Sequence, residues 1–354
     1  DQGPRVPGPN EVGWIFWLRQ CLSIDIRSLA LMRILVGAVV VLDLLCCWSH
    51  VPLLLTDQGV YPRELLLRSR PWTFIPSIYM LCGSIETTYT FYMVHLLAAV
   101  ALMLGYKTRW SSLLCFVFTV SVQMRNPWIV LGADQMIRLV LFYGIFLPWG
   151  EVWSFDECPE SQAGSARAGQ VCTPMVASWK IQLALVYLAA GLAKRGLCWD
   201  DGTAIEMALQ ADGYSREFGL AVLNWAQQFD GLLAALTFLV GPGEALLGLL
   251  LITPWRRTQQ LGFWGLVLMH IVFNSCLSLG RFGLLSVSVL SCFYLFKPKP
   301  QRVDRWQWPW GETFLGLSLV LIAAISNLNA LGGKWKQSFP QLRTGLGELG
   351  LQQS

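Results

Sequence analysis

Charged side chains inside long apolar stretches are the residues of this sequence best suited to chemistry. Arg33 and Asp43 lie in one such stretch, and Asp134 and Arg138 lie in another. A charge at membrane depth costs at least about 2.5–3.5 kcal/mol, so these side chains should face protein or water and not lipid. The i,i+4 spacing of Asp134 and Arg138 places them on one helix face, where they can neutralise each other. We expect the four residues to form a buried charge network, which either sets the register of the helices or lines a cavity.

A second polar pair, His270 and Asn274, also has i,i+4 spacing within an apolar stretch and therefore shares one helix face. His95 is alone on its predicted helix, where we expect a hydrogen-bonded packing role. The spacing of cysteines and histidines gives no zinc motif, and no metal site is predicted. The sequence also lacks a P-loop, a Gly-rich nucleotide fingerprint, an HExxH motif and a GxSxG elbow, which argues against hydrolases and nucleotide-driven pumps.

The elements that must position these side chains follow from the composition. Of the 354 residues, 54% are hydrophobic and only 14% are charged, whereas a soluble domain is about 45–50% apolar and about 25% charged. The net charge of +4 comes from scattered residues and not from a basic block. These values argue against a soluble enzyme, a disordered chain and a nucleic-acid binder. We predict an all-α integral membrane protein whose partners are membrane lipids and other membrane-protein subunits, with no nucleic acid.

The apolar stretches predict a polytopic bundle of about eight or nine transmembrane helices, each needing roughly 20 residues. Ser23 or Asp25 should cap the first of these helices. A Gly-Pro-Gly sequence at 241–243 should break the sixth helix beside Glu244. Residues 203–228 should form two short amphipathic helices on the membrane surface. The predicted spans are 29–48, 88–105, 110–123, 128–149, 176–192, 232–252, 261–279, 282–296 and 314–331.

The long polar loop between two of these spans bears on orientation and compartment. Cys158 and Cys172 flank the loop and could form a disulfide in an oxidising compartment. The short turns that are rich in Lys and Arg favour an N-terminus on the inner side of the membrane. That orientation places the cysteine loop on the same side, which argues against the disulfide. The sequence leaves open a bacterial inner membrane or an organelle membrane.

Four stretches of the sequence form a series that is recognisable from their order and spacing. They are Ser23–Arg33 followed by Asp43; Asn126-Pro127 through Gly132–Asp134 and Arg138 to Phe146–Pro148 and Trp153–Asp156; Tyr187–Lys194 with Trp199 and Gly202; and His270–Asn274 through Leu279–Phe282. Together they resemble the horizontally transferred transmembrane (HTTM) domain, the membrane part of vitamin K-dependent gamma-carboxylase. The resemblance, with the span pattern, divides the chain into an N-terminal extension with an interfacial segment (1–22), a carboxylase-like transmembrane domain (23–296), and a final helix with a polar tail (297–354).

The resemblance also implies a catalytic role for one lysine. In the carboxylase, a lysine in the motif that matches Gly191–Trp199 is the base that deprotonates reduced vitamin K. Lys194 stands at that lysine's position, with His270 as its partner. A quinone or vitamin K-like cofactor would then lie near His270, Asn274 and Trp199. A lysine acts as a base near neutral pH only if its pKa falls well below about 10.4.

The same lysine also has a purely structural interpretation. Lys194 lies at the end of an apolar span, where a lysine extends its ammonium group to the membrane boundary and interacts with the helix dipole. At the boundary the ammonium would be solvated or paired with Asp200 or Asp201 across the short turn. We favour this boundary position.

Two departures from the carboxylase pattern bear on function. The family's catalytic histidine aligns near Ala133 or Asp134, and neither is a histidine. We also expect no counterpart of the luminal region with which the carboxylase binds its substrate. We therefore predict a non-catalytic membrane scaffold or accessory subunit of a larger complex, which holds lipid, quinone or pigment. The alternative is a membrane enzyme or maturation factor that uses a quinol-type cofactor with Lys194 as base.

Overall fold

The computed structural model describes residues 12–69, 77–156, 169–294, 296, 305–306 and 310–322. The described residues are mostly helical and include almost no strand, which confirms the predicted all-α class. Contacts divide them into two compact units of interleaved sequence. Unit 1 takes the described residues within Asp1–Ser23, Cys172–Gly280 and Trp306–Ser354, and unit 2 takes those within Ile24–Val171 and Arg281–Arg305.

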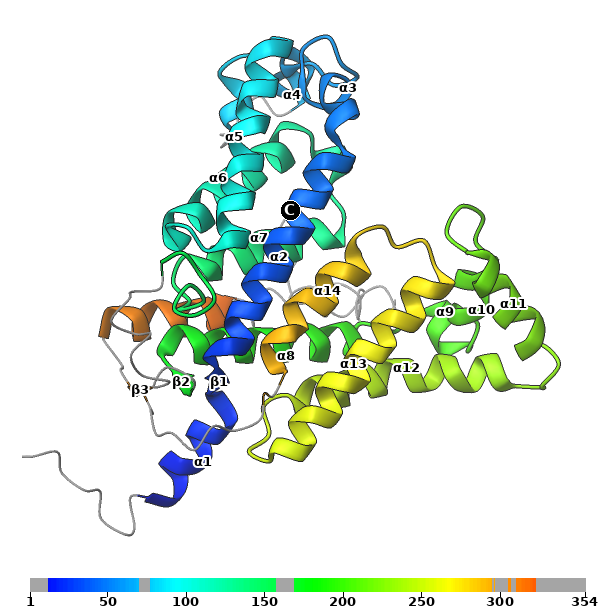
Figure 1. Ribbon diagram of the computed structural model, residues 1–354. Helices are drawn as coiled ribbons and strands as arrows, with labels where there is room; N and C mark the ends of the chain where they lie inside the picture. Colours follow the sequence, from blue (N-terminus) through cyan, green and yellow to red (C-terminus); the bar gives the residue numbers. More distant parts are fainter. Residues whose placement is uncertain are drawn as a thin grey trace, which may run out of the picture. The chain divides into compact units, whose positions relative to one another are not determined.

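Unit 2 is organised around α2, which is coloured blue in Figure 1. This helix packs against α5 and α14, while α6 packs against both α5 and α7. The elements of unit 2 are α2 (Ile26–Cys46), η1 (Trp48–His50), α3 (Val51–Leu55), α4 (Arg63–Ser69), η2 (Ile78–Met80), α5 (Ile85–Leu104), α6 (Thr108–Arg125), η3 (Pro127–Ile129), α7 (Gly132–Gly144), α14 (Phe282–Leu290) and η6 (Ser291–Phe293).

Unit 1 is built on the pairing of α12 with α8, and α13 also packs against α12. The two predicted short helices within 203–228 are present as α10 and α11, whose apolar side chains pack with those of α12 and α13. The elements of unit 1 are α1 (Val12–Leu22), α8 (Pro174–Leu192), α9 (Leu197–Asp200), α10 (Ala204–Gln210), α11 (Glu217–Ala226), α12 (Leu232–Leu250), α13 (Arg256–Cys276) and a helix over Trp310–Ile322.

The described strands are very short. They are β1 (Ile24–Asp25), β2 (Gln170–Cys172) and β3 (Arg305–Trp306). β1 pairs with β2 in antiparallel register, with Ile24 opposite Val171. This pairing ties the start of α2 to the residues before α8 and adds no separate sheet domain.

Side-chain caps fix where the long helices begin. Asp25 is the N-cap of α2 and accepts a hydrogen bond from the backbone N–H of Arg27 at 2.9 Å, which confirms one of the two predicted caps. Ser84 caps α5 in the same way. Thr173 caps α8 and is followed by a proline at the first helical position, where the missing N–H costs nothing.

Four described helices are long and apolar enough to cross a membrane, namely α2, α5, α8 and α12. α6 and α13 have 18 and 21 residues, but polar side chains lower their mean hydropathy. α7 has 13 residues and α14 has 9, fewer than the roughly 20 that a bilayer needs. The four helices support a membrane protein, whereas the count of eight or nine spans stays a prediction. The part of the last predicted span after Ile322 lies outside the described residues.

Two predictions about the helices were wrong, one on the length of a span and one on a break within a helix. The expected span over 128–149 reduces to η3 and the 13-residue α7. The Gly-Pro-Gly sequence does not break its helix, because α12 runs continuously through Pro242. A proline inside a membrane helix is tolerated when neighbouring helices hold the backbone in place, and α12 packs along α8 here.

Glycines allow α8 and α12 to approach each other closely. A Cβ atom built on Gly191 of α8 would lie 2.4 Å from the carbonyl oxygen of Gly241 and 2.8 Å from the Cβ atom of Ala245. Both distances are too short for real contacts, so the crossing requires glycine at 191. Close backbone approach at small residues is a common way in which membrane helices associate.

We therefore expect Gly191→Ala to destabilise unit 1 by roughly 1–3 kcal/mol, the usual range for overpacking. The measurement is the thermal unfolding midpoint of the purified chain in detergent. Gly243→Ala is the matched control on α12, since a Cβ atom there meets nothing within 4 Å. An unchanged midpoint for Gly191→Ala would show that the two helices do not cross at this glycine.

Candidate functional site

Lys194 lies just after the C-terminal end of α8 and forms an ion pair with Glu244 of α12. Its Nζ atom also donates to the carbonyl oxygen of Ala190 at 3.3 Å and lies 5.7 Å from the ring centroid of Trp199. The exposed fractions of the two paired side chains are 18% for Lys194 and 8% for Glu244. The ammonium group is therefore held by a carboxylate, a carbonyl and an aromatic face, largely out of water.

This arrangement corrects the expected partners of Lys194. Asp200, which is close in sequence, accepts a hydrogen bond from the backbone N–H of Gly196 at 3.2 Å and does not bind the lysine. Glu244 is the true partner, and the sequence analysis assigned it no role. The signal was present, because Glu244 is the only charged residue in the apolar stretch that forms α12, and an intramembrane charge requires a partner.

His270 is buried on α13 and forms a hydrogen bond with the hydroxyl group of Tyr187 on α8, with 3.0 Å between the hydroxyl oxygen and Nε2. Asn274 lies one turn further along α13, and its Oδ1 atom is buried without a hydrogen-bond partner. The structure thus places His270 and Asn274 on one helix as predicted, and it brings Trp199 to Lys194. Whether these residues hold a cofactor stays a prediction.

Arg281, which precedes α14, bridges two carboxylates in unit 2. Its Nη1 atom pairs with Asp43 of α2, and its Nη2 atom pairs with Asp134 of α7. The second oxygen of Asp134 accepts a hydrogen bond from the backbone N–H of Leu131 at 2.8 Å and so caps α7. One guanidinium group therefore joins three segments that are far apart in the sequence. The planar guanidinium group presents several N–H donors in a fixed geometry that matches carboxylate oxygens.

Asp43 and Asp134 were predicted network members, but Arg33 and Arg138 are not their partners. Arg33 is fully buried and donates from Nη2 to the carbonyl oxygen of Trp153. It lies ten residues before Asp43, about 15 Å along a helix, which is too far for a shared contact. Arg138 is on the same helix as Asp134, but that carboxylate is turned back to cap the start of α7. Among the described residues, Arg138 has no ion pair.

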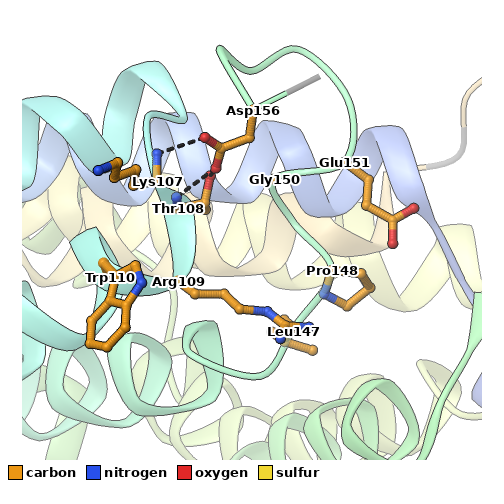
Figure 2. A pocket seen from close by; sticks show the side chains of 9 residues that line it. All are labelled: Lys107, Thr108, Arg109, Trp110, Leu147, Pro148, Gly150, Glu151 and Asp156. Carbon is orange, nitrogen blue, oxygen red and sulfur yellow. Dashed lines mark hydrogen bonds between the residues drawn. The ribbon is translucent and has the colours of Figure 1, made fainter. Parts of the chain in front are cut away.

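A cavity of about 490 Å³ lies in unit 2 where α5 turns into α6. Figure 2 shows the side chains of Arg109 and Glu151 at this cavity, with Trp110 beside Arg109. The figure also shows the carboxylate of Asp156 at the start of α6. That carboxylate accepts hydrogen bonds from the backbone N–H groups of Lys107 at 2.7 Å and Thr108 at 2.6 Å.

The hydrogen bonds at this helix start determine the ionisation of Asp156. Partial burial raises the pKa of Asp156, but the N–H and hydroxyl groups of Thr108 and the N–H group of Lys107 outweigh it, so the pKa lies below its ordinary value. The carboxylate therefore stays charged at neutral pH and caps α6 from a distant loop. No group of three or more potential metal ligands forms within the described ranges.

Comparison with known families decides what kind of chain this is. The family model of the HTTM domain matches residues 22–297. The chain belongs to the HTTM domain family. This domain is the membrane domain of the vitamin K-dependent gamma-carboxylase family. No curated protein and no solved structure matches the sequence.

Two positions of this HTTM domain bear directly on the carboxylase resemblance. The resemblance implies that the catalytic histidine of the carboxylase aligns near Ala133 or Asp134. Ala133 is buried, and Asp134 is bound to Arg281 and to the start of α7. The loop that carries Cys158 lies outside the described residues, so the disulfide with Cys172 stays a prediction. Cys172 itself is buried at the end of β2.

Replacing Arg281 should show how strongly the HTTM domain depends on the bridge. Arg281→Leu leaves Asp43 and Asp134 without their cation, which should lower stability by roughly 3 kcal/mol, near the lower end for a buried pair. Arg138→Leu is the matched control, expected within about 0.5 kcal/mol of wild type. Thermal unfolding in detergent measures both. Equal effects of the two variants would contradict the bridge.

The cap on α6 gives a pH-dependent prediction. Asp156→Ala should cost about 1 kcal/mol at pH 7, as for other lost helix caps. Because the pKa of Asp156 is lowered on folding, its contribution is present above about pH 4 and is lost as the pH falls through the folded-state pKa. The difference in unfolding midpoint between wild type and Asp156→Ala should therefore shrink below about pH 4. Asp212→Ala, an exposed acid outside any described hydrogen bond, serves as control. A difference that grows in acid would refute the cap.

Proposed function

We propose that this HTTM chain is a non-catalytic scaffold or accessory subunit of a larger membrane complex, and that it holds membrane lipid. The observation that carries the proposal is the ion pair between Lys194 and Glu244. An amine can act as a base only when its lone pair is free. An ammonium group that is bound to a carboxylate has no lone pair to accept a proton from a quinol.

The position of the family's catalytic histidine supports the same proposal. Asp134 is engaged with Arg281 and with the backbone of α7, so it is committed to holding helices together. Lys194, and Asp134 near the expected histidine position, therefore both have structural partners in this chain. Resemblance of a fold does not by itself transfer an activity, since function resides in particular sites.

Two surfaces support the lipid-holding part of the proposal. The first is the cavity in Figure 2, where Arg109 and Trp110 lie in the first turn of α6, shortly after the apolar helix α5 ends at Leu104. Aromatic and basic side chains at the end of an apolar span are typical of the depth of lipid headgroups. The second is α11, whose Phe218 and Trp225 have exposed fractions of 58% and 55%. A short helix with large exposed apolar side chains is suited to lie in the membrane interface.

A second candidate function has one observation in its favour. Asn274 leaves a buried acceptor atom without a partner one turn from His270, and a bound molecule with a hydroxyl group would satisfy it. On this alternative the chain is a membrane enzyme or maturation factor that binds a quinol-type cofactor. Glu244 would then have to release Lys194 before the lysine could act as a base.

A carboxylation assay separates the two functions. The full chain is reconstituted in lipid nanodiscs with reduced vitamin K, labelled CO₂ and a glutamate-containing peptide, and Lys194→Met is compared with Lys107→Met. Scaffold function predicts no incorporation above background in any sample. Incorporation by the wild type that Lys194→Met abolishes and Lys107→Met retains would overturn the proposal. A discrete complex with fixed stoichiometry of subunits, isolated from native membranes, is the positive result that scaffold function requires.

The ion pair itself is tested by a double-mutant cycle. Lys194→Met and Glu244→Gln should each lower the unfolding midpoint, because each leaves an uncompensated charge in an apolar setting. The double variant removes both charges and should recover much of the loss, with a coupling free energy of about 1–3 kcal/mol. Purely additive effects would remove the observation on which the scaffold proposal rests.

A further inference from the structure

Unit 2 contains a second, smaller cavity of about 70 Å³ that none of the preceding functions uses. Helices α2, α3, α5, α6 and α7 contribute to its lining, together with Arg281. Half of the lining residues are aliphatic, and the polar ones include Asp43, His95, Gln123 and Asp134. A cavity of this size has room for one small molecule or a few waters.

The charges at the cavity do not balance. Arg281 pairs with both Asp43 and Asp134, so one positive charge faces two carboxylates. The other polar residues of the lining, His95 and Gln123 among them, supply no fixed positive charge. The cavity therefore carries one excess negative charge within an apolar unit, where an unbalanced charge is costly. A monovalent cation would balance it.

Hydrogen-bond acceptors at the cavity also lack donors. The amide nitrogen of Gln123 donates to the carbonyl oxygen of Asp134 at 2.9 Å, which fixes the amide and leaves its Oε1 atom buried without a partner. His95 bonds through Nε2 to the hydroxyl group of Thr119 at 3.3 Å, and its Nδ1 atom is likewise buried without a partner. Gln123 and His95 are each only 3% exposed. When Nε2 of His95 donates to Thr119, Nδ1 is an acceptor.

The cavity is also accessible from outside. The exposed fractions of the Asp43 and Arg281 side chains are 25% and 27%, whereas His95 and Gln123 are buried. A small solute can therefore reach the carboxylate of Asp43 first and the buried acceptors next. One oxygen of Asp43 bonds to Arg281, which leaves the second oxygen of this carboxylate for a ligand.

We propose that this cavity binds a small ammonium-type cation, either ammonium itself or methylammonium. Its positive charge balances the excess carboxylate, and its N–H groups donate to Asp43, to Oε1 of Gln123 and to Nδ1 of His95. A metal cation of the same charge supplies no N–H donors, and a quaternary ammonium has none either. The inference does not depend on the ion pair of Lys194 with Glu244 that carries the scaffold proposal, because that pair lies in unit 1, although Asp134 and Arg281 enter both arguments.

The test is a calorimetric titration of the full chain in lipid nanodiscs with ammonium chloride and with methylammonium chloride. Potassium chloride and tetramethylammonium chloride at equal ionic strength are the reference salts. We expect saturable binding of the two N–H donors and none of the reference salts. Asp43→Asn should weaken binding at least tenfold, whereas Asp212→Asn, an exposed acid in unit 1, should leave it unchanged.

Gln123→Leu keeps both carboxylates and Arg281, so it tests the site even if Asp43→Asn does not fold. This variant should weaken ammonium binding at least threefold. Three results would each overturn the proposal. They are an absence of saturable binding, which would mean that the cavity holds only water, equal binding of potassium or tetramethylammonium, and binding that neither Gln123→Leu nor a folded Asp43→Asn alters.

Discussion

The need to neutralise charge inside apolar helices is the constraint on which the rest of this structure depends. Arg281 meets it in unit 2, where a single guanidinium group binds Asp43 on α2 and Asp134 on α7. Without this cation, two carboxylates in an apolar unit would lack a counter-charge, and the ionic link from the start of α14 to α2 and α7 would be lost. In unit 1 the ion pair of Lys194 with Glu244 joins the end of α8 to α12 in the same manner.

These charges have a consequence for function. A residue that holds two helices together has its hydrogen-bonding capacity taken by structural partners, and it is poorly placed to exchange protons with a substrate. The gamma-carboxylase resemblance implies a base at Lys194 and a histidine position near Ala133 or Asp134, and both Lys194 and Asp134 are bound to such structural partners. In this HTTM domain, Lys194 and Asp134 both take part in ion pairs that link separate helical segments.

Features set by neighbouring residues in the sequence were predictable. The cap at Asp25, the starts and ends of α2 and α5, and the two short helices after Thr203 all depend on local patterns of apolar, capping and turn residues. The HTTM resemblance was also readable, because it rests on the order of short motifs. The apolar stretch over 128–149 led to an overestimate of the length of α7. One apolar run can contain both a helix of 13 residues and the non-helical residues beside it.

Partners that come from distant segments could not be predicted in the same way. Asp134 has a basic residue at i+4, yet it binds Arg281, 147 positions away, because its carboxylate turns back to cap α7. Glu244 was visible as a lone charge, but the sequence does not say which of several cations it meets. Pro242 indicated a break, and the tight packing of α12 on α8 at Gly191 keeps the helix continuous. In each case tertiary contact overrode a valid local expectation.

The most direct test of the need to neutralise charge is the stability of a chain that lacks the three charges of the Arg281 bridge. The measurement is the thermal unfolding midpoint of a triple variant, Arg281→Leu with Asp43→Asn and Asp134→Asn, compared with Arg281→Leu alone. If Arg281 serves to neutralise the two carboxylates, removing all three charges should recover most of the stability that the single variant loses. A triple variant that unfolds at the same midpoint as Arg281→Leu, or below it, would contradict that role.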